Sequence, residues 1–153
     1  MLFRSFEEIR VWSPNKLHAE QFAKEIGAKT MSAEDAVRGA AVIVTATSST
    51  TPVLHGAWLK SGCHVNAVGA CRPDWRELDD DVMRNVVFVD SREAAMKESG
   101  DVILSGAKIY AELGEAFAGK ASRGSETTIF KSLGMAVEDI AAALLVYRKA
   151  IRK

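Results

Sequence analysis

The stretch HVNAVGACRPDWRELDDDVM, residues 64–83, decides how the rest of the chain is interpreted. It begins with a short apolar run, residues 64–68, that is typical of a buried strand, and Gly69 then breaks this run into a loop. The loop carries a thiol, two guanidinium groups and a carboxylate, on Cys71, Arg72, Arg76 and Asp74. Because ligands of open α/β sheets bind outside the carboxyl ends of strands, we expect this loop to line a site.

The composition excludes several classes of partner. Twenty basic and twenty acidic residues cancel to a formal charge of zero, so we expect neither nucleic acid nor a membrane surface as a partner. No apolar segment reaches the roughly 18 residues that span a bilayer, and no signal peptide is evident, so we expect a cytoplasmic protein. Cys63 and Cys71 fit neither a disulfide framework nor a zinc site, and we expect no bound metal.

Apolar runs alternate with helical patterns along the chain. Strands are expected at 8–12, 29–31, 41–47, 64–68, 86–90 and 127–130. Helices are expected at 15–26, 32–39, 91–97, 109–113 and 134–152. The run 41–47 is continuously apolar and β-branched, as expected of a parallel strand that is covered on both faces. The alternation predicts an α/β fold with a parallel sheet built from βαβ units.

The start of the sequence lacks one expected feature. A dinucleotide-binding unit opens with a strand, a glycine-rich turn and a helix whose N-terminus binds the pyrophosphate, and the strand at 8–12 resembles the second strand of such a unit. We expect residues 1–7 to be the tail of that helix, with Leu2, Phe3 and Phe6 facing the core. The expected fold is an incomplete Rossmann-type parallel sheet that lacks the first strand and the glycine-rich turn, with a long C-terminal helix.

Three blocks of sequence resemble the ornithine cyclodeaminase/mu-crystallin family, and they are more similar to its mu-crystallins than to its cyclodeaminases. They are HVNAVGACRPDWRELDDDVM at 64–83, EAAMKESGDVILSGA at 93–107 and TTIFKSLGMAVEDIAAA at 127–143. The resemblance covers nearly the whole chain and corresponds to the C-terminal half to two-thirds of the family's proteins. It implies that residues 1–133 form a partial dinucleotide-binding domain and that residues 134–153 form a helix that packs toward an upstream domain.

The resemblance also implies a function. It indicates NAD(P)H-dependent reduction of cyclic ketimines by a protein that is a homodimer at full length, with activity impaired in this shortened chain. Two alternatives stay open: a non-catalytic protein that binds thyroid hormone or serves as a crystallin, and a shortened isoform with neither activity.

A cofactor site follows from the same resemblance. Its residues are Trp12, Ser13, Asn15, Thr47, Ser48, Val68, Gly69 and Ser132. Where the family has an arginine that neutralises the 2′-phosphate of NADPH, this sequence has Pro14, which has neither charge nor donor. NADPH is the cofactor that the resemblance implies, and Pro14 makes NADH the alternative.

The resemblance implies substrate contacts at Cys71, Arg72 and Glu98. Cyclodeaminases carry an aspartate as acid and base at the position of Cys71, so a carboxylate proton shuttle is excluded there. Arg72 would bind a substrate carboxylate, and Glu98 would meet the ligand's amino group. The alternatives are a small buried thiol at Cys71, and Arg72 and Glu98 that pair with each other or with nearby loops. We assign no catalytic residue.

Other polar groups have a structural and a functional interpretation. The acids Asp74, Glu77 and 79–81 favour a helix start over a cation site. Residues 48–51 form either a phosphate cradle or a turn before Pro52. His64 is expected to be a hydrogen-bonded strand residue, whereas His18 and His55 are expected in solvent.

Overall fold

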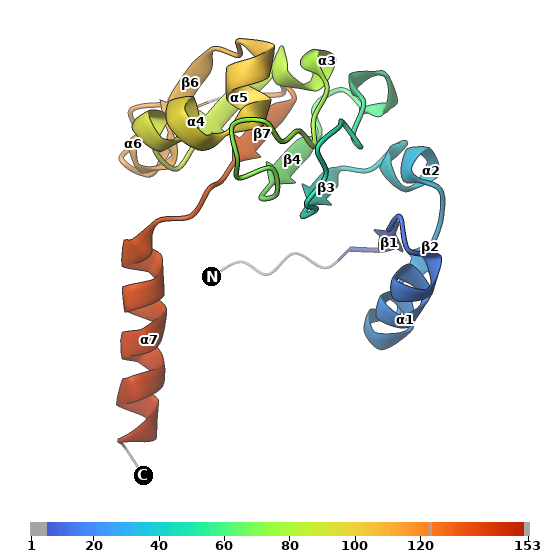
Figure 1. The fold of residues 1–153 in the computed structure, drawn as a ribbon, viewed down its shortest axis with the longest axis horizontal. Helices are drawn as coiled ribbons and strands as arrows, with labels where there is room; N and C mark the ends of the chain where they lie inside the picture. The colour runs from blue at the N-terminus through green and yellow to red at the C-terminus, as the bar shows by residue number, and fades with distance from the viewer. Residues whose placement is uncertain (1–5, 123, 152–153) are drawn as a thin grey trace.

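The computed structural model describes residues 6–122 and 124–151, which form two parallel sheets (Figure 1). The smaller sheet pairs β1 (Arg10–Val11) with β2 (Lys29–Thr30), and α1 (Lys16–Ile26) connects them. The larger sheet has five strands in the order β3 (Val42–Thr45), β4 (His64–Ala67), β7 (Thr128–Lys131), β5 (Val86–Val89) and β6 (Ile109–Glu112). Every pairing is parallel, which confirms the predicted α/β class.

Short polar side chains begin most of the helices, as the sequence patterns predict. Asn15, Ser32 and Ser91 accept hydrogen bonds from backbone N–H groups in the first turns of α1, α2 and α4. Gly27 ends α1 in the left-handed conformation, with φ of 70°. The remaining helical segments are α2 (Ala33–Val37), η1 (Gly56–Trp58), α3 (Asp80–Met83), α4 (Arg92–Glu98), α5 (Gly100–Ser105), α6 (Leu113–Phe117) and α7 (Ala136–Ala150).

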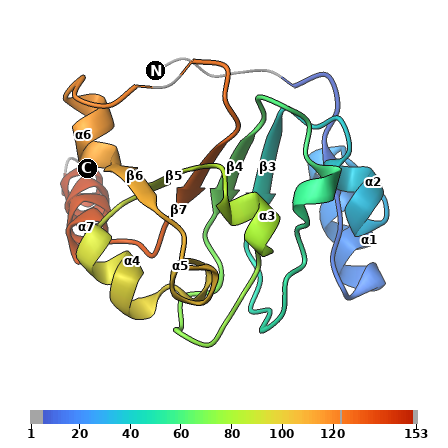
Figure 2. The ribbon, with the colours of Figure 1, turned by 90° about the horizontal axis from the view of Figure 1, so that it is seen from above.

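The core lies on one face of the larger sheet, between the strands and the helices α3, α4 and α5 (Figure 2). Val65, Val87 and Ile129 on the three central strands are fully buried there. The other face is open at β3, where Val44 is 64% exposed. The prediction that 41–47 is covered on both faces is therefore wrong, because Ile43 and Thr45 are buried on one face of β3 while the face that carries Val44 is not covered by the described residues.

The segment predicted as a short helix at 109–113 is instead the edge strand β6 followed by α6. Tertiary contacts override the helical pattern. The Arg92 guanidinium donates hydrogen bonds to the carbonyl oxygens of Ile109 at 3.0 Å and Tyr110 at 3.1 Å, and the segment pairs with β5. The sequence pattern also missed α5, which begins at the Ser99 cap.

Both ends of the described chain expose apolar side chains. Phe6 and Glu7 are not helical and Phe6 is 53% exposed, so the core-facing role expected of Phe6 is wrong; Leu2 and Phe3 lie outside the described residues. The helix α7 forms as predicted and extends away from the sheets (Figure 1), with none of its residues buried. No helix in 6–122 or 124–151 is long and apolar enough to cross a membrane.

Candidate functional site at the carboxyl ends of the strands

The five parallel strands bring several predicted site residues together at their carboxyl ends, which form one end of the larger sheet. Thr47 and Ser48 follow β3, Val68 and Gly69 follow β4, and Ser132 follows β7. These three strands are adjacent in the sheet, so their carboxyl ends are neighbours. The backbone links two of them directly, because the Ser132 N–H donates to the Ala67 carbonyl oxygen at 3.0 Å. Their proximity follows from topology, whereas their role in cofactor binding stays a prediction.

The carboxylate of Glu77 connects the carboxyl ends of β3 and β4 through hydrogen bonds to residues of both. It accepts hydrogen bonds from Thr45 Oγ1 at 2.9 Å, from the Gly69 N–H at 2.9 Å and from the Thr47 N–H. Its side chain is fully buried. The interpretation of Glu77 as part of an acidic helix start is therefore wrong, because its carboxylate caps two strand ends in the interior.

The segment 48–51 hydrogen-bonds to itself. The Ser49 N–H donates to Thr47 Oγ1 at 3.1 Å, the Ser49 hydroxyl donates to the Thr51 carbonyl at 2.6 Å, and the Thr51 N–H donates to Ser49 Oγ at 3.3 Å. Such bonds are those of a serine and threonine turn. This favours the turn over a phosphate cradle.

The three expected substrate-contact residues are exposed. The Arg72 guanidinium carbon lies 4.8 Å from the centroid of the Trp75 ring, and Arg72 has no hydrogen-bond or ion-pair partner for its side chain among residues 6–122 and 124–151. Glu98 likewise has none in that range, so the two do not pair with each other, and Cys71 is not the buried thiol of the alternative interpretation. A stacked cation without a counter-ion can bind an anionic ligand.

Gly100 fixes the loop that carries Arg72. The Gly100 N–H donates to the Arg72 carbonyl oxygen at 3.0 Å, and the Trp75 N–H donates to the same oxygen at 3.0 Å. A Cβ atom on Gly100 would overlap the Trp75 carbonyl oxygen. This contact brings the start of α5, two residues after Glu98, against the Arg72 loop.

Asp90 organises the turn that follows β7. Its Oδ2 atom accepts from the Ser132 hydroxyl at 3.0 Å and from the backbone N–H groups of Leu133 and Gly134, both at 2.7 Å. Its Oδ1 atom accepts from the Ser91 N–H at 2.9 Å. The hydroxyl of Ser132 therefore points toward Asp90 and presents its oxygen as an acceptor.

The remaining predicted cofactor residues lie apart from this edge, after β1. Asn15 Oδ1 accepts from the Leu17 N–H at 3.1 Å, and Ser13 Oγ accepts from the Asn15 N–H at 3.2 Å. Trp12 is half-buried beside them. No hydrogen bond within the described ranges connects these residues to the ends of β3, β4 or β7.

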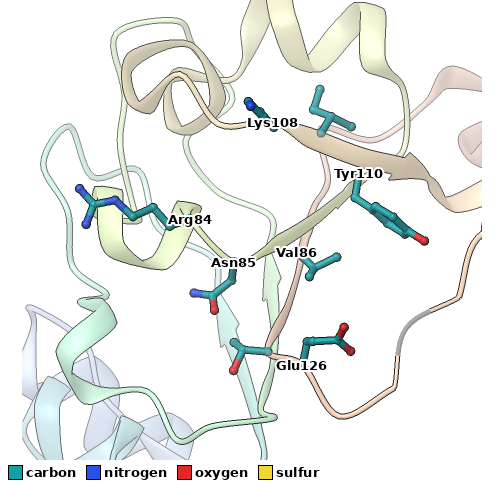
Figure 3. Close-up of a pocket in the computed structure, with 8 residues that line it drawn as sticks. Arg84, Asn85, Val86, Lys108, Tyr110 and Glu126 are labelled. Atoms are coloured by element: carbon teal, nitrogen blue, oxygen red, sulfur yellow. The ribbon is translucent and has the colours of Figure 1, made fainter.

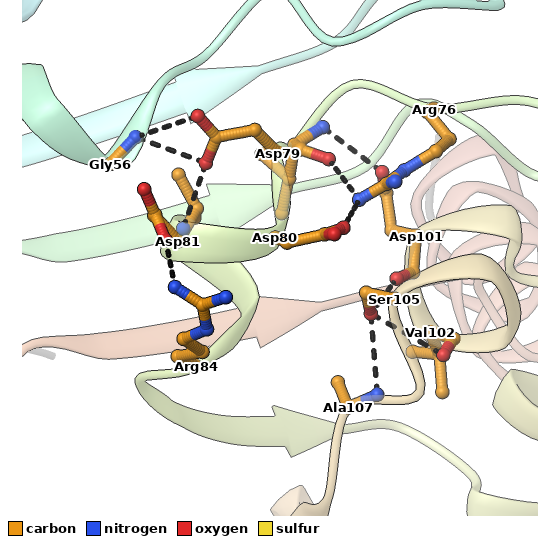
Figure 4. Close-up of polar contacts among 12 residues, drawn as sticks. Gly56, Arg76, Asp79, Asp80, Asp81, Arg84, Asp101, Val102, Ser105 and Ala107 are labelled. Carbon is orange, nitrogen blue, oxygen red and sulfur yellow. Dashed lines mark hydrogen bonds and ion pairs between the residues drawn. The ribbon is translucent and has the colours of Figure 1, made fainter.

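The acidic run 79–81 is a helix start, as predicted (Figure 4). Asp79 Oδ1 accepts from the Val82 N–H at 2.9 Å, Asp80 pairs with Arg76 at 2.8 Å, and Asp81 pairs with Arg84. Residues 6–122 and 124–151 contain no group of three acids, histidines or cysteines that could hold a metal ion.

His64 and His55 make contacts through their rings, whereas His18 is exposed, as expected. His64 Nδ1 lies 2.7 Å from Thr128 Oγ1, as expected of a hydrogen-bonded strand residue. His55 is half-buried, with Nδ1 3.1 Å from Asp79 Oδ2 and its ring edge-on to Trp58, so its expected place in solvent is wrong.

Burial raises the pKa of the Cys63 thiol, which keeps it protonated.

A hollow of about 530 Å³ lies at the opposite end of the strands, where β5 and β6 begin (Figure 3). Its lining residues are Arg84, Asn85, Val86, Lys108, Ile109, Tyr110, Glu126 and Thr127. None of the predicted site residues lines it, and the loops that follow the strands are at the other edge. We therefore do not assign the ligand site to this hollow.

Sequence reasoning missed three buried ionisable groups beneath the site. Asp90 and Asp101 are acids within or next to apolar segments, and Lys131 is a lysine at the end of a buried strand. A charged residue inside an apolar run is a usable signal, because such a residue is rarely buried without a partner. The identity of the partner could not be inferred from sequence.

Comparisons with known proteins identify relatives of this chain. The model of the ornithine cyclodeaminase/mu-crystallin family matches residues 2–153. The ketimine reductase mu-crystallin of Macropus fuliginosus is 59% identical over 148 residues, which cover 94% of this chain and 47% of that protein. The chain thus spans about half the length of the curated relatives it matches.

Solved structures give the same coverage. The Δ1-pyrroline-2-carboxylate reductase of Thermococcus litoralis, in complex with NADH and L-proline, superposes with a TM-score of 0.85 at 36% identity, over 94% of this chain and 50% of that one. An archaeal alanine dehydrogenase dimer with bound NAD superposes with a TM-score of 0.84 at 30% identity, over 95% and 50%.

Proposed function

The chain belongs to the ornithine cyclodeaminase/mu-crystallin family, and we propose that it forms part of the cofactor-binding domain of an NAD(P)H-dependent reductase of cyclic ketimines. One observation carries the proposal. Residues after β3, β4 and β7, including Thr47, Gly69 and Ser132, meet at the carboxyl edge of a parallel sheet, which is where such sheets bind dinucleotides. A relative with the same fold is described in complex with NADH.

An incomplete Rossmann topology is supported first by β1, which has a partner strand on one side only. The N–H groups of Lys29 and Met31 in the neighbouring strand donate to the carbonyls of Ile9 at 3.0 Å and Val11 at 3.1 Å. Because bonding alternates along a strand, the backbone of Arg10 faces the opposite edge. No strand of the described chain pairs with that edge.

The edge of β3 is free in the same way. His64 and Val68 donate from their N–H groups to the carbonyls of Ala41 and Thr45, both at 2.9 Å, so the backbone polar groups of Val42 and Val44 face away from β4. The doubly wound strand order 3-2-1-4-5-6 has one strand between those that correspond to β1 and β3. We propose that this slot takes the first strand of the domain, whose glycine-rich turn would bind the pyrophosphate.

The domain division is part of the same proposal. Residues 1–133 would form the partial dinucleotide-binding domain, and residues 134–153 would pack their helix against an upstream domain. The exposed apolar face of α7, with Val137 at 60% and Ile140 at 66% exposed, supports the second part. A homodimer at full length is proposed by analogy with the alanine dehydrogenase dimer.

The cofactor would be NADPH, with NADH as the alternative. Pro14 supplies no charge for a 2′-phosphate, and Lys16, with a side chain that is 86% exposed, could supply only a point charge at the start of α1. When bound, the nicotinamide would supply the hydride that reduces the imine carbon. Thr47, Ser48, Val68, Gly69 and Ser132 would line its side of the cleft, with Trp12, Ser13 and Asn15 at the adenosine end.

The substrate would be a cyclic ketimine that carries a carboxylate. Arg72 offers a guanidinium that stacks on Trp75 and lacks a protein counter-ion within the described residues, and this arrangement suits a substrate carboxylate. Glu98 would accept from the ring nitrogen. Cys71 offers no carboxylate that could act as the acid and base of a deamination. The proposed reaction is therefore reduction of the carbon–nitrogen double bond alone.

A chimera tests this proposal. The 153 residues would replace the matching half of the Macropus fuliginosus ketimine reductase, and loss of NADPH or NADH would be followed with a thiazoline or piperideine carboxylate. We expect turnover by the chimera. A folded chimera that binds the nucleotide without turnover would overturn the reductase proposal, and direct binding of an iodothyronine would then favour the hormone-binding alternative.

The isolated chain provides the second test. We expect little or no affinity for NADPH, because the strand and the turn that would bind the pyrophosphate are outside its sequence. Micromolar binding of NADPH by the isolated chain, measured by calorimetry, would contradict the proposed incomplete domain.

A further inference from the structure

Three ionisable side chains lie fully buried beneath the turns that follow β3 and β4. Glu77, Asp101 and Lys131 each have no exposed surface. Two carboxyl groups and one amino group in the interior are costly to desolvate unless each is held by hydrogen bonds or by an opposite charge. Their contacts therefore indicate what their burial achieves.

The charges converge on one residue, Gly69. Its N–H donates to Glu77 Oε2 at 2.9 Å, and its carbonyl oxygen accepts from Lys131 Nζ. Glu77 extends the arrangement to the neighbouring turn, because its other carboxylate oxygen accepts from the Thr47 N–H. Both backbone polar groups of Gly69 are thus bound by buried charged side chains.

Asp101 connects the two charges. Its Oδ1 atom accepts from the backbone N–H groups of Glu77 at 2.9 Å and Leu78 at 3.0 Å, which fixes the segment that carries the Glu77 side chain. Its Oδ2 atom lies 3.5 Å from Lys131 Nζ and has no hydrogen-bond partner within the described chain. The ion pair with Lys131 is the interaction that compensates this buried oxygen.

The surroundings of Gly69 leave no space for a side chain. A Cβ atom at this position would overlap the Thr47 carbonyl oxygen and the Glu77 carboxyl group. The next residue, Ala70, has a φ of 50°, a left-handed conformation that is uncommon for alanine. The turn is therefore enclosed on the protein side and held in an unfavourable backbone conformation by its surroundings.

We propose that Glu77, Asp101 and Lys131 act as one positioning unit that holds the Thr47 and Gly69 turns in a fixed relation at the ligand edge. The three residues do not contact the ligand themselves, because all are fully buried. The unit also determines what the turns can offer. The N–H groups of Thr47 and Gly69 are both bound to Glu77, so these two groups are not available to donate to a phosphate.

A consequence concerns the part of the cofactor that meets this edge. Because the Thr47 and Gly69 N–H groups are already bound to Glu77, this part of the ligand site suits the uncharged dihydronicotinamide ring of the reduced cofactor, and the anionic pyrophosphate would be bound by other groups of the domain. This consequence rests on the proposed function, whereas the positioning unit itself requires no cofactor.

Amide hydrogen exchange of the 153-residue chain, followed by NMR, tests the unit without any ligand. In the native chain the Thr47 and Gly69 amides should exchange as slowly as core strand amides such as Ile129. Exchange as fast as that of the exposed turn amide of Ser48 would overturn the proposal. This measurement is decisive even when a variant does not fold, and its failure is distinct from failure of the reductase assay.

Variants then identify the positioning residues. Glu77→Gln should raise the exchange rates of Thr47 and Gly69 by about 10- to 100-fold, because a charged acceptor is replaced, with a smaller rise at Ile129. Lys131→Met should do the same at Gly69, and Lys131→Arg should restore part of the protection. Equal changes at Gly69 and Ile129 in these variants would show a merely structural role.

Discussion

Asp90, at the end of β5, receives the hydroxyl hydrogen bond of Ser132 at 3.0 Å and thereby fixes the turn that follows β7. The same carboxylate accepts from two more backbone N–H groups of this turn, at Leu133 and Gly134. Because an aspartate accepts through both oxygens and an asparagine only through one, the turn depends on the charge as well as on the shape of the side chain.

The first prediction concerns this carboxylate. We expect Asp90→Asn to lower the free energy of unfolding by about 1.5–3 kcal/mol, the range for hydrogen bonds to a charged group. Urea unfolding followed by circular dichroism measures the change. Asp74→Asn is the matched control, because Asp74 is exposed and should be neutral. Equal stability of the two variants would contradict the role of Asp90.

The second prediction concerns Gly69. We expect Gly69→Ala to destabilise the chain by about 1–3 kcal/mol or more, because the new methyl group overlaps the Thr47 carbonyl and the Glu77 carboxyl group. Gly114→Ala is the control, since nothing lies within 4 Å of a Cβ atom there and alanine favours the helix. Thermal unfolding should rank Gly69→Ala well below the native chain and Gly114→Ala at or above it.

Sequence patterns predicted the fold class and most strands because short apolar runs with flanking caps are local signals. They failed where distant contacts decide. The helix predicted at 109–113 is a strand because Arg92 and β5 bind its backbone, and Val44 is exposed because its face of β3 is not covered in the described chain. Neither the Arg92 contact nor the covering of the two faces of β3 is encoded in a local window.

The site was predictable in part for the same reason. Thr47 and Gly69 could be placed at one edge because both directly follow parallel strands. The unit beneath them could not, since the Lys131 contact with Gly69 spans 62 positions and the Asp101 contact with Glu77 spans 24. Glu77 was misassigned because it stands next to an acidic helix start, and only the three-dimensional structure shows that its side chain turns inward.

The third prediction follows from the burial of Asp101. Burial raises the pKa of its carboxyl group above the ordinary value of 3.8, although a hydrogen bond from the Leu78 N–H and the charge of Lys131 act in the other direction. An acid whose pKa is raised by folding stabilises the folded state below its unfolded pKa. That contribution is lost as the pH rises through the folded pKa.

Comparison with Asp101→Asn isolates this contribution. As the pH rises above 3.8, the free energy of unfolding of the native chain should fall relative to that of the variant, by at most about 1.4 kcal/mol per pH unit. Urea unfolding of both proteins over a pH series measures the difference. A native chain that gains stability relative to Asp101→Asn as the pH rises would contradict a raised pKa.

The fourth prediction tests cofactor preference in the chimera described above. Pro14→Arg should shift the ratio of kcat/KM for NADPH over NADH toward NADPH by about 10- to 100-fold, because a guanidinium can bind the 2′-phosphate through paired hydrogen bonds. Pro14→Ala is the control for loss of the proline ring, and it should leave the ratio unchanged. The same shift in both variants would mean that the backbone, rather than the charge, sets the preference.

The last prediction concerns α7, whose apolar side chains face solvent in this chain. Ile140 is 66% exposed and Ile129 is fully buried, so the same residue type provides a matched pair. Ile140→Gln should change the free energy of unfolding of the isolated chain by less than about 0.5 kcal/mol, whereas Ile129→Ala should cost about 2–5 kcal/mol. In the chimera, Ile140→Gln should become destabilising, because the upstream domain would cover this face. Urea unfolding of the isolated chain and of the chimera separates the two states, and an Ile140→Gln effect that is equally small in both would show that α7 remains uncovered.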